Sequence, residues 1–460
     1  MKENKRIDII DPTTGEVIDF VPITSKEEVE SIGYIVKQAA LQCRSLSRFK
    51  RSDILAETAK LIALEKHQFA ELITQETGKT ITQSYKEVDR CINTFQLAAE
   101  EVKRHIGEQI PFDSYHGAEN RQGYFTREPL GVIVAITPFN DPLNLVAHKL
   151  APAIAAGNSI LLKPSELAPL SAIKLKQLIV RAGFPDNAIA IVTGDAITGR
   201  ALVTLPYVRM VSFTGGITTG EAIVKAGGLK KYAMDLGGNA PVIVLADCDL
   251  DQAVEACVLG SFWAAGQNCI GTQRIIIEDE IYDTFKQKLL DNVKLMKVGD
   301  PMDPEVDMGP MISEQAAKAA QEKVNLAVQT GAKVLCGHTR EGAFYQPTVL
   351  ENVSRDALVL SDEVFGPIVS LIKVNHFEQA LTLANEPDYS LHAGIFTNDL
   401  AKAQKAIKAL EFSGVMINDS SDYRFDAMPF GGYKYGGLGR EGVKFAMQEM
   451  SQTKTVCFVN

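Results

Sequence analysis

The chain has 460 residues, 46% hydrophobic and 23% charged, which is typical of a soluble protein with two or three domains. Its net charge of −10, with scattered lysines and arginines, argues against a nucleic-acid partner. The start lacks a signal-peptide core, and no apolar stretch could span a bilayer. Seven irregularly spaced cysteines without a C-x-x-C pair indicate neither a zinc site nor a disulfide framework, so we expect a cytoplasmic protein.

The first 111 residues predict a short strand region followed by helices. Ser25 with Glu28 three residues later matches a capping box at a helix start. Residues 57–64 and 84–105 carry helical periodicity. Residues 112–130, with a turn rich in Gly and Asn, predict an extended hairpin.

From Gly131 onward, strand-like and helix-like runs alternate. The strands are predicted at 132–136, 159–163, 188–192, 210–214 and 232–236. Two of the helices between them are expected to begin at Asp141-Pro142 and at Ser165-Glu166. This alternation predicts a parallel sheet with a nucleotide site at the strand ends.

A second series of strands follows from Pro241 to about Asn418. These strands are predicted at 242–245, 274–278, 333–335, 347–350, 369–374, 393–397 and 414–418. The final run, 453–459, has no partner nearby in the sequence. We therefore expect it to pair with the 112–130 segment or with another subunit.

Cys269 is the most informative single residue. It follows a helical stretch, 250–265, and a polar Gly-Gln-Asn break that lets the sulfur face a cleft. Upstream, Asp235 stands at a predicted strand end before two glycines that allow close backbone approach. A thiol, a carboxylate and an amide are the parts of covalent catalysis on a carbonyl. Isolated cysteines are usually inert core residues, but the surrounding pattern favours a nucleophile.

Seven short motifs, in order and at family-like spacing, resemble those of the aldehyde dehydrogenase superfamily over nearly the whole chain. They are Thr137-Pro138-Phe139-Asn140, Lys163-Pro164-Ser165-Glu166, Phe213-Thr214-Gly215-Gly216, Asp235-Leu236-Gly237-Gly238, Gly266-Gln267-Asn268-Cys269, Glu363-Val364-Phe365 and Met428-Pro429-Phe430. The resemblance implies an α/β fold with three parts. These are a Rossmann-like cofactor domain (1–111 and 131–237), an α/β catalytic domain (238–437) and a small β oligomerisation element (112–130 and 438–460) that builds a homodimer or homotetramer.

The resemblance also implies catalytic roles. Cys269 would attack the aldehyde to form a thiohemiacetal and then a thioester, while Asn140 would hold the oxyanion or, alternatively, cap the next helix. Asp235 stands where the family usually has a glutamate base, and its side chain is about 1.5 Å shorter. It could instead bond backbone amides. Lys149 and Glu441 match proton-relay positions, although they could form an ordinary ion pair.

The cofactor implied by the resemblance is NAD, with NADP as the alternative. The residues carried over are Thr137, Pro138, Phe139, Lys163, Ser165, Glu166, Phe213, Thr214, Gly215, Gly216, Leu236, Gly237, Glu363 and Phe365. Glu166 would accept hydrogen bonds from the ribose and repel a 2′-phosphate, or it could only offset the helix dipole. Gly215 and Gly216 would let the pyrophosphate approach a helix N-terminus.

Candidate substrate residues are fewer. Trp263, Phe430 and Phe139 could form an apolar tunnel or belong to the core. Arg424, in a loop just before Phe430, could bind a carboxylate, phosphonate or sulfonate, or could pair with Asp422 or Asp426. Similar loops occur in lactaldehyde and succinate-semialdehyde dehydrogenase-like members, which favours a small polar aldehyde.

The predicted function is NAD(P)-dependent oxidation of a small, polar or anionic aldehyde to its carboxylic acid. One alternative is a CoA-acylating enzyme, which would not need an acid at position 235. The other is a catalytically silent structural protein, against which Cys269, Asn140 and Glu363 argue. A metal-dependent hydrolase is disfavoured, because the seven histidines show no ligand spacing.

Overall fold

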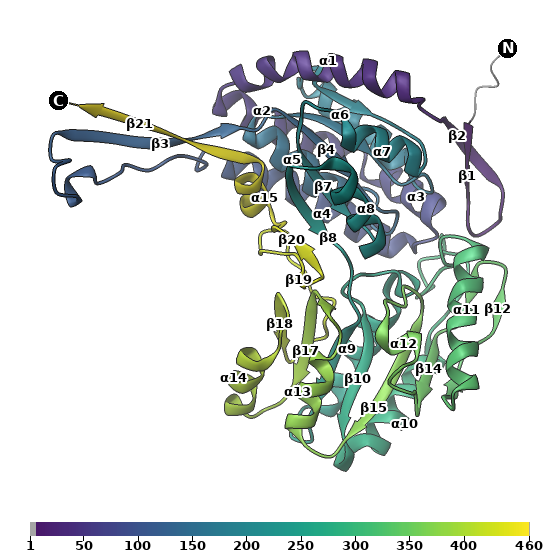
Figure 1. Ribbon diagram of the computed structural model, residues 1–460. Coiled ribbons are helices and arrows are strands. Elements are labelled where there is room, and N and C mark those ends of the chain that lie inside the picture. Colours follow the sequence, from purple (N-terminus) through teal and green to yellow (C-terminus); the bar gives the residue numbers. More distant parts are fainter. Residues whose placement is uncertain (1–5, 460) are drawn as a thin grey trace.

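The computed structural model describes residues 6–459, which form two α/β units and a projecting arm (Figure 1). The first unit, coloured purple to teal, contains the N-terminal helices, and the second, coloured green, follows it along the chain. No helix within residues 6–459 is long and apolar enough to cross a membrane. The α/β class predicted from the alternating pattern is confirmed.

The first unit is built on a six-stranded sheet with the order β20-β8-β7-β4-β5-β6. Its strands are β4 (Val132–Ile136), β5 (Ser159–Lys163), β6 (Ile189–Ile191), β7 (Val208–Thr214), β8 (Lys231–Asp235) and β20 (Gly437–Leu438). β4 to β8 are parallel, and β20 pairs antiparallel with β8. The predicted strands are confirmed because parallel strands buried on both faces appear in a sequence as continuous apolar runs.

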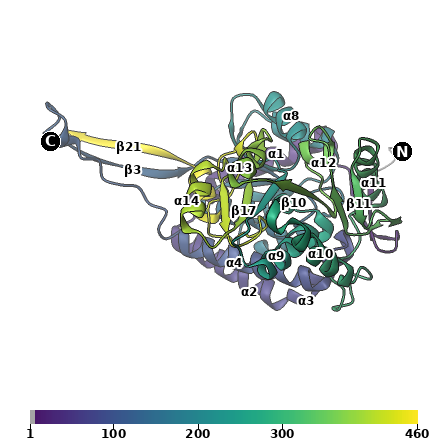
Figure 2. The same ribbon diagram turned by 90° about the horizontal axis from the view of Figure 1, so that it is seen from below.

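Helices cover both faces of this sheet (Figures 1 and 2). They are α1 (Lys26–Ser45), α2 (Arg48–Leu64), α3 (Lys66–Thr77), α4 (Ile81–Glu101), α5 (Asn144–Ala156), α6 (Leu170–Arg181), α7 (Ala196–Thr204) and α8 (Ile217–Gly227), with the short turn η2 (Asp186–Ala188). The capping box of Ser25 and Glu28 is present at the start of α1, as predicted.

Two predicted helix starts are wrong. α5 begins at Asn144 instead of Asp141, because the Asp141 carboxylate is held by Lys79 and cannot cap the helix. α6 begins at Leu170 instead of Ser165. There Pro169 disfavours the helical conformation of the residue before it, so the helix cannot extend further back.

The second unit is built on a seven-stranded sheet with the order β11-β14-β15-β10-β9-β17-β18, parallel except for β11. Its strands are β9 (Ala240–Val244), β10 (Thr272–Glu278), β11 (Lys333–Cys336), β14 (Thr348–Glu351), β15 (Ile368–Val374), β17 (His392–Phe396) and β18 (Gly414–Ile417). Its helices are α9 (Leu250–Phe262), α10 (Asp279–Leu295), α11 (Glu314–Gln329), α12 (Leu358–Ser361), α13 (Phe377–Asn385) and α14 (Leu400–Ala409). The helix predicted at 250–265 is shorter and gives way to a 3₁₀ turn, η3 (Trp263–Gly266).

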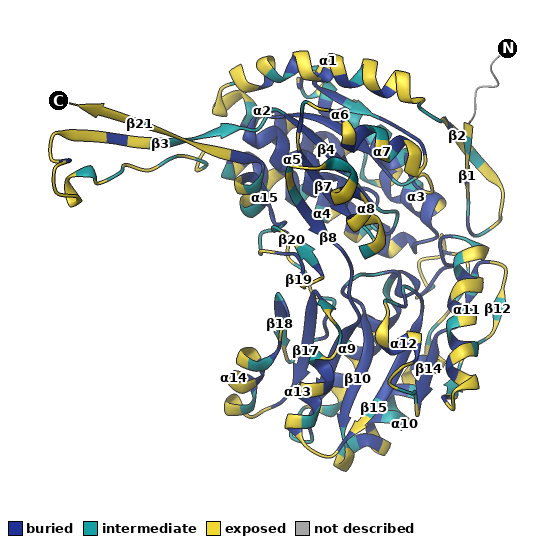
Figure 3. Ribbon diagram, in the orientation of Figure 1, coloured by how far each residue is buried: buried dark blue, intermediate teal, exposed yellow. Residues whose placement is uncertain are grey.

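The arm consists of β3 (Arg121–Pro129) and β21 (Ser451–Val459), which pair antiparallel along their whole length. It extends away from both units, and most of it is exposed (Figures 2 and 3). The predicted pairing of the C-terminal run with the 112–130 segment is confirmed. The hairpin predicted within 112–130 is wrong, because this segment contains only the turn η1 (Phe112–Ser114) and one strand. The remaining short elements are β1 (Arg6–Ile10), β2 (Val17–Pro22), β12 (Arg340–Glu341), β13 (Phe344–Tyr345), β16 (Tyr389–Ser390), β19 (Tyr433–Lys434) and α15 (Val443–Glu449).

A four-residue link joins the two sheets. β8 ends at Asp235 and β9 begins at Ala240, so residues 236–239 pass from one unit to the other. Cys269 lies just before β10, which is the neighbour of β9. The link runs close to it, because a Cβ on Gly238 would lie 3.7 Å from the Cys269 carbonyl oxygen. The topology therefore brings Asp235 and Cys269 to the junction of the two units.

Candidate active site

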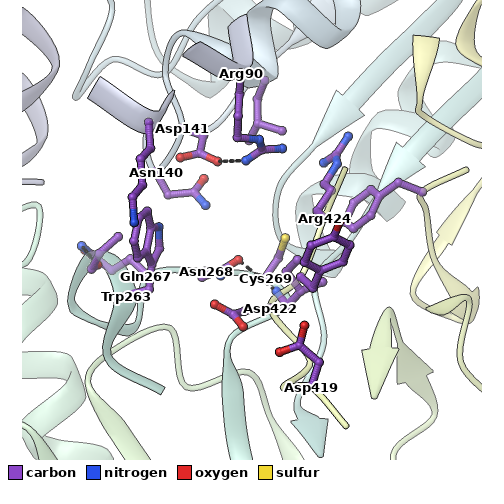
Figure 4. Close-up of a pocket in the computed structure, with 16 residues that line it drawn as sticks. Arg90, Asn140, Asp141, Trp263, Gln267, Asn268, Cys269, Asp419, Asp422 and Arg424 are labelled. Atoms are coloured by element: carbon purple, nitrogen blue, oxygen red, sulfur yellow. Dashed lines mark hydrogen bonds and ion pairs between the residues drawn. The ribbon is translucent and has the colours of Figure 1, made fainter. Parts of the chain in front are cut away.

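A cavity of about 450 Å³ opens at this junction and is lined by both units (Figure 4). Five of the predicted residues line it, namely Asn140, Trp263, Cys269, Arg424 and Phe430. They come from segments far apart in the sequence. We call this space the thiol cavity.

The loop that presents Cys269 has an unusual backbone. Residues 264–266 all have positive φ, at 49°, 54° and 68°. Gly266 is required there, because a Cβ would lie 2.1 Å from the carbonyl oxygen of Gly366. The Gln267 side chain fixes the loop with two hydrogen bonds to backbone groups, at 3.0 and 3.1 Å. The loop therefore holds Cys269 in a defined position, and such strain is concentrated at functional sites.

The Cys269 thiol is neutral near pH 7. Burial raises the pKa of the thiol well above its usual range, and the neighbouring Glu363 carboxyl raises it further. Arg424 acts in the opposite direction but does not reverse the shift. Because the thiolate is the nucleophilic form, a base must take the thiol proton before any attack.

The Asp235 carboxyl is buried at the end of β8, and its Oδ2 makes no hydrogen bond. Burial, together with the adjoining Glu441 carboxylate, raises the pKa of Asp235 well above its usual value. The alternative prediction, that this side chain bonds backbone amides, is wrong for the described residues. Asp235 therefore rests in its protonated form beside Glu441.

Glu441 is held as an anion by two cations. Lys149 Nζ donates to Glu441 Oε1 at 2.7 Å and to Thr214 Oγ1 at 2.8 Å. Arg424 Nη2 donates to Glu441 Oε2 at 2.9 Å. Although burial opposes ionisation, these cations hold the pKa of Glu441 well below its usual range. Lys149 and Glu441 therefore form the ion pair that was the alternative prediction for these two residues.

The expected partners of Arg424 are wrong. The guanidinium pairs with Glu441, not with Asp422 or Asp426, and lies 3.7 Å from the centre of the Phe430 ring. Asp426 is instead engaged by Arg90 and His148, each at 3.0 Å. Glu441 comes from a segment that follows the site in sequence and folds back onto it, so local spacing could not reveal the pair.

Asn140 faces the thiol cavity with a free amide. Its side chain makes no hydrogen bond within residues 6–459, and the alternative role as a cap is wrong. The first amides of α5, those of Leu143 and Asn144, donate to Glu87 Oε1 at 2.8 and 3.0 Å. Glu87 therefore satisfies this helix end and leaves Asn140 available.

A second cavity, of about 770 Å³, lies at the carboxyl ends of β4, β5 and β7. Nine of the residues predicted for the cofactor line it, namely Thr137, Pro138, Lys163, Ser165, Glu166, Phe213, Thr214, Gly215 and Gly216. Gly216 is the N-cap of α8 and offers no side chain to the first amides of the helix. A Cβ on Gly215 would lie 2.6 Å from the Phe213 ring. These features fit the adenosine and pyrophosphate of a dinucleotide. We call this second space the dinucleotide cavity.

The dinucleotide cavity carries more positive charge than the sequence motifs indicate. Glu166 is bound by Lys163 Nζ at 3.3 Å. Arg200 on α7 and Lys225 on α8 also line the cavity, and neither belongs to a recognised motif. Neither residue carries a sequence signal apart from its position on a helix of the first unit.

The other predicted cofactor residues do not line the dinucleotide cavity: they are Phe139, Leu236, Gly237, Glu363 and Phe365. The amide of Gly238 donates to Glu363 Oε1 at 3.4 Å, and burial raises the pKa of Glu363 to about 8. Phe139 and Phe365 meet edge to face at 5.7 Å. Gly237 has a φ of 87° and faces Glu363, while Leu236 packs under Gly220 of α8.

The thiol cavity also contains charged residues that were not predicted as site residues, namely Lys86, Arg90, Asp141, Asp419 and Asp422. Arg90 and Asp141 pair at 3.6 Å on one side of the cavity (Figure 4). Asp419 and Asp422 belong to the loop that contains Arg424, and this proximity was the one available signal.

A cavity that contains a thiol, together with a second cavity at the strand ends of a parallel sheet that fits a dinucleotide, is typical of a nicotinamide-dependent dehydrogenase. Comparison with protein families matches residues 1–456 to the aldehyde dehydrogenase family. The chain therefore belongs to the aldehyde dehydrogenase family and is an NAD(P)-dependent enzyme.

Three relatives illustrate the match. Aspartate-semialdehyde dehydrogenase 1 of Pseudomonas canavaninivorans is 55% identical, over 98% of this chain and 96% of that protein. The 3-sulfolactaldehyde dehydrogenase of Priestia megaterium is 41% identical, over 98% and 94%. The crystal structure of glyceraldehyde-3-phosphate dehydrogenase GapN from Methanocaldococcus jannaschii, complexed with NADP, is 42% identical with a TM-score of 0.96, and each chain is covered completely.

Proposed function

We propose that the chain oxidises a small anionic aldehyde to its carboxylic acid through a covalent intermediate on Cys269. One observation carries the proposal: a thiol, a free amide and a guanidinium line a single cavity. These groups are the nucleophile, an oxyanion donor and an anion-binding group that such a reaction needs.

Attack on the aldehyde begins at Cys269. Once the thiol proton has passed to solvent water, the sulfur adds to the carbonyl carbon and negative charge develops on the oxygen. The Asn140 amide, which has no other hydrogen bond within the described residues, is available to donate to that oxygen. We assign the second donor to the backbone N–H of Cys269.

The dinucleotide would be held by the second cavity. Lys163 and Glu166 would bind the adenosine ribose, and the N-terminus of α8 would face the pyrophosphate. Glu363 would bind the nicotinamide ribose. When bound, the nicotinamide supplies the hydride acceptor of the oxidation. The fit rests on the glycine cradle at Gly215 and on the uncapped helix end.

Hydrolysis of the thioester depends on proton transfer through Asp235. Because the resting carboxyl is protonated, Asp235 can act as a base only after it has lost its proton to solvent. The charges of Lys149 and Arg424 favour this ionisation, since both lower the pKa of Asp235. The ionised Asp235 can then accept a proton from the attacking water.

The preference for an anionic aldehyde rests on Arg424. Its side chain is only 6% exposed, and it lines the thiol cavity. Nη2 is used by Glu441, while Nη1 makes no hydrogen bond within residues 6–459. A partly desolvated guanidinium binds carboxylate or sulfonate oxygens well. The two curated relatives are named for aldehydes that carry such groups.

The test is NAD(P)H formation from short aldehydes that differ only in an anionic group, with and without CoA. We expect turnover without CoA and a higher kcat/KM for the anionic member. Arg424→Gln should reduce that preference by about tenfold or more, since a charge-assisted hydrogen bond contributes about 1.5–3 kcal/mol. NADH formation only with CoA would show that the thioester is not hydrolysed, and equal use of neutral aldehydes would refute the assignment of Arg424.

We further infer that the arm joins copies of the chain into a homodimer or homotetramer. Tyr124, Phe458 and Val459 are exposed on it, at 43%, 54% and 62%. Residues 108–110 pair with part of β3, whereas the outer edge of β21 is unpaired within residues 6–459. The seven free cysteines support a reducing, cytoplasmic location. Light scattering of the full chain and of a Phe458→Asp variant would test the assembly.

A further inference from the structure

We propose that the preferred aldehyde carries an ammonium group next to its anionic group, as in an α-amino-acid semialdehyde, and that Asp419 and Asp422 bind the ammonium. This inference deepens the proposed function and rests on it. It assigns these two carboxylates as determinants of substrate specificity.

Asp419 and Asp422 present unpaired carboxylate oxygens to the thiol cavity. In Figure 4 they lie on the far side of the Cys269 sulfur from the Arg90–Asp141 pair. Asp419 Oδ1 accepts the Ser420 amide at 2.8 Å, and Asp422 Oδ1 accepts the Ser420 hydroxyl. The second oxygen of each makes no hydrogen bond, and neither residue forms an ion pair within the described residues.

The other acids of the cavity are already neutralised. Asp141 contacts both Lys79 and Arg90, and Glu441, behind Arg424, is held by two cations. Lys86 lies at the wall with its Nζ 5.0 Å from the centre of the Trp263 ring. The free carboxylates are therefore concentrated in one part of the wall.

The negative charges of Asp419 and Asp422 repel each other when no cation is bound between them. Burial raises the pKa of Asp422, and the charge of Asp419 adds to the shift even though the Ser420 hydroxyl opposes it. Partly buried like charges are stabilised by a cation that contacts both. A substrate ammonium has three donors and could reach two free oxygens at once.

Arg424 supplies a second, independent indication of a charged ligand. Its side chain is 6% exposed, its Nε is buried without a partner, and its Nη1 is free. It lies two residues after Asp422 on the same loop and lines the same cavity. One loop therefore supplies a cation and two anions to the wall of one cavity. An α-amino acid carries a carboxylate and an ammonium on one carbon, so its two charged groups are complementary to these side chains.

The experiment is a four-aldehyde cycle with the full-length enzyme and NAD or NADP. Aspartate semialdehyde carries both charged groups, succinate semialdehyde lacks the ammonium, 3-aminopropanal lacks the carboxylate, and propanal lacks both. We expect aspartate semialdehyde to have the highest kcat/KM, at least about tenfold above succinate semialdehyde. The gain in kcat/KM from the ammonium should also be larger when the carboxylate is present than when it is absent.

Variants locate the effect. Asp422→Asn keeps the size of the side chain and its bond to Ser420, and should remove about tenfold or more of the preference for the ammonium. NADH binding within about twofold of wild type, at a cavity that does not contain Asp422, reports that the variant is folded. Asp356→Asn, an exposed carboxylate outside the cavity, is the matched control and should leave all four values as they are.

The outcomes separate the two proposals. If succinate semialdehyde equals or exceeds aspartate semialdehyde in the wild-type enzyme, this inference is wrong while the proposed function stands. If 3-aminopropanal is the best substrate, the cavity selects an ammonium without a carboxylate, and the inference is equally wrong. If none of the four aldehydes yields NAD(P)H, the proposed function fails and this inference fails with it.

Discussion

The two cavities of this enzyme are built in different ways. The dinucleotide cavity takes most of its predicted residues from strand ends and the loops that follow them, which are short local motifs, while Arg200 and Lys225 come from within helices. The thiol cavity combines α4, the loop after β4, the loop before β10 and the loop after β18. Local motifs therefore account for much of the dinucleotide cavity, whereas the thiol cavity is assembled from segments that are distant in the sequence. The following experiments separate the two cavities.

The largest expected effect follows from Cys269→Ser. Dehydrogenase activity should fall by about a thousandfold or more, because a serine hydroxyl in this buried site is a far weaker nucleophile. The dinucleotide cavity shares no residue with the thiol cavity, so NADH binding, followed by fluorescence, should remain within about twofold of wild type. Loss of NADH binding in this variant would contradict the separation of the two cavities.

Asp235→Asn should reduce steady-state turnover by about a hundredfold, because the amide cannot accept a proton from water. Rapid mixing should still show an initial burst of NADH, since the oxidation precedes hydrolysis. Asp235→Glu, which restores the longer side chain usual in the family, should retain most of the turnover. If Asp235→Asn turned over at the wild-type rate, another group would have to be the base.

The pH dependence of Cys269 alkylation should reflect its buried environment. Because the pKa of this thiol is raised, the reactive thiolate is scarce at pH 7 and increases as the pH rises. The rate of iodoacetamide labelling should therefore rise about tenfold per pH unit from 7 to 9 without levelling off. Peptide mapping separates Cys269 from the exposed Cys457. A plateau below pH 8 would mean that the thiol is activated before substrate binds.

The smallest expected effect concerns the choice between NAD and NADP. Arg200→Ala should weaken binding of 2′,5′-ADP about three- to tenfold and leave binding of 5′-AMP nearly unchanged, since Arg200 offers an exposed cation for a 2′-phosphate. Arg209→Ala, an exposed arginine outside both cavities, is the control. Calorimetry measures this without turnover. Equal losses for both nucleotides would assign Arg200 to the adenine instead.

Sequence patterns predicted the strands better than the ends of helices. Strands such as β4 and β5 are buried throughout and appear as uninterrupted apolar runs. The start of α5 was mispredicted because Asp141 is committed to Lys79, a residue 62 positions away. A long-range ion pair of this kind overrides local capping preferences and leaves no trace in a short window of sequence.

The candidate site shows the same limit. Motif residues such as Gly215 and Gly216 could be located because their backbone geometry is required by the turn they occupy. The partner of Arg424 could not, because Glu441 reaches it only after the chain folds back through β20 and into α15. The free oxygens of Asp419 and Asp422 could not be predicted either, because a sequence does not show which carboxylates lack a cationic partner in the folded chain.

The most direct test is chemical trapping on the Asp235→Asn variant. The variant is mixed with an oxidisable aldehyde and NAD, quenched in acid during the burst, and digested for peptide mass analysis. Our proposal predicts an acyl group on the peptide that contains Cys269, and no adduct when NAD is omitted from an otherwise identical quench. An unmodified Cys269 peptide in a sample that has formed one NADH per chain would contradict it.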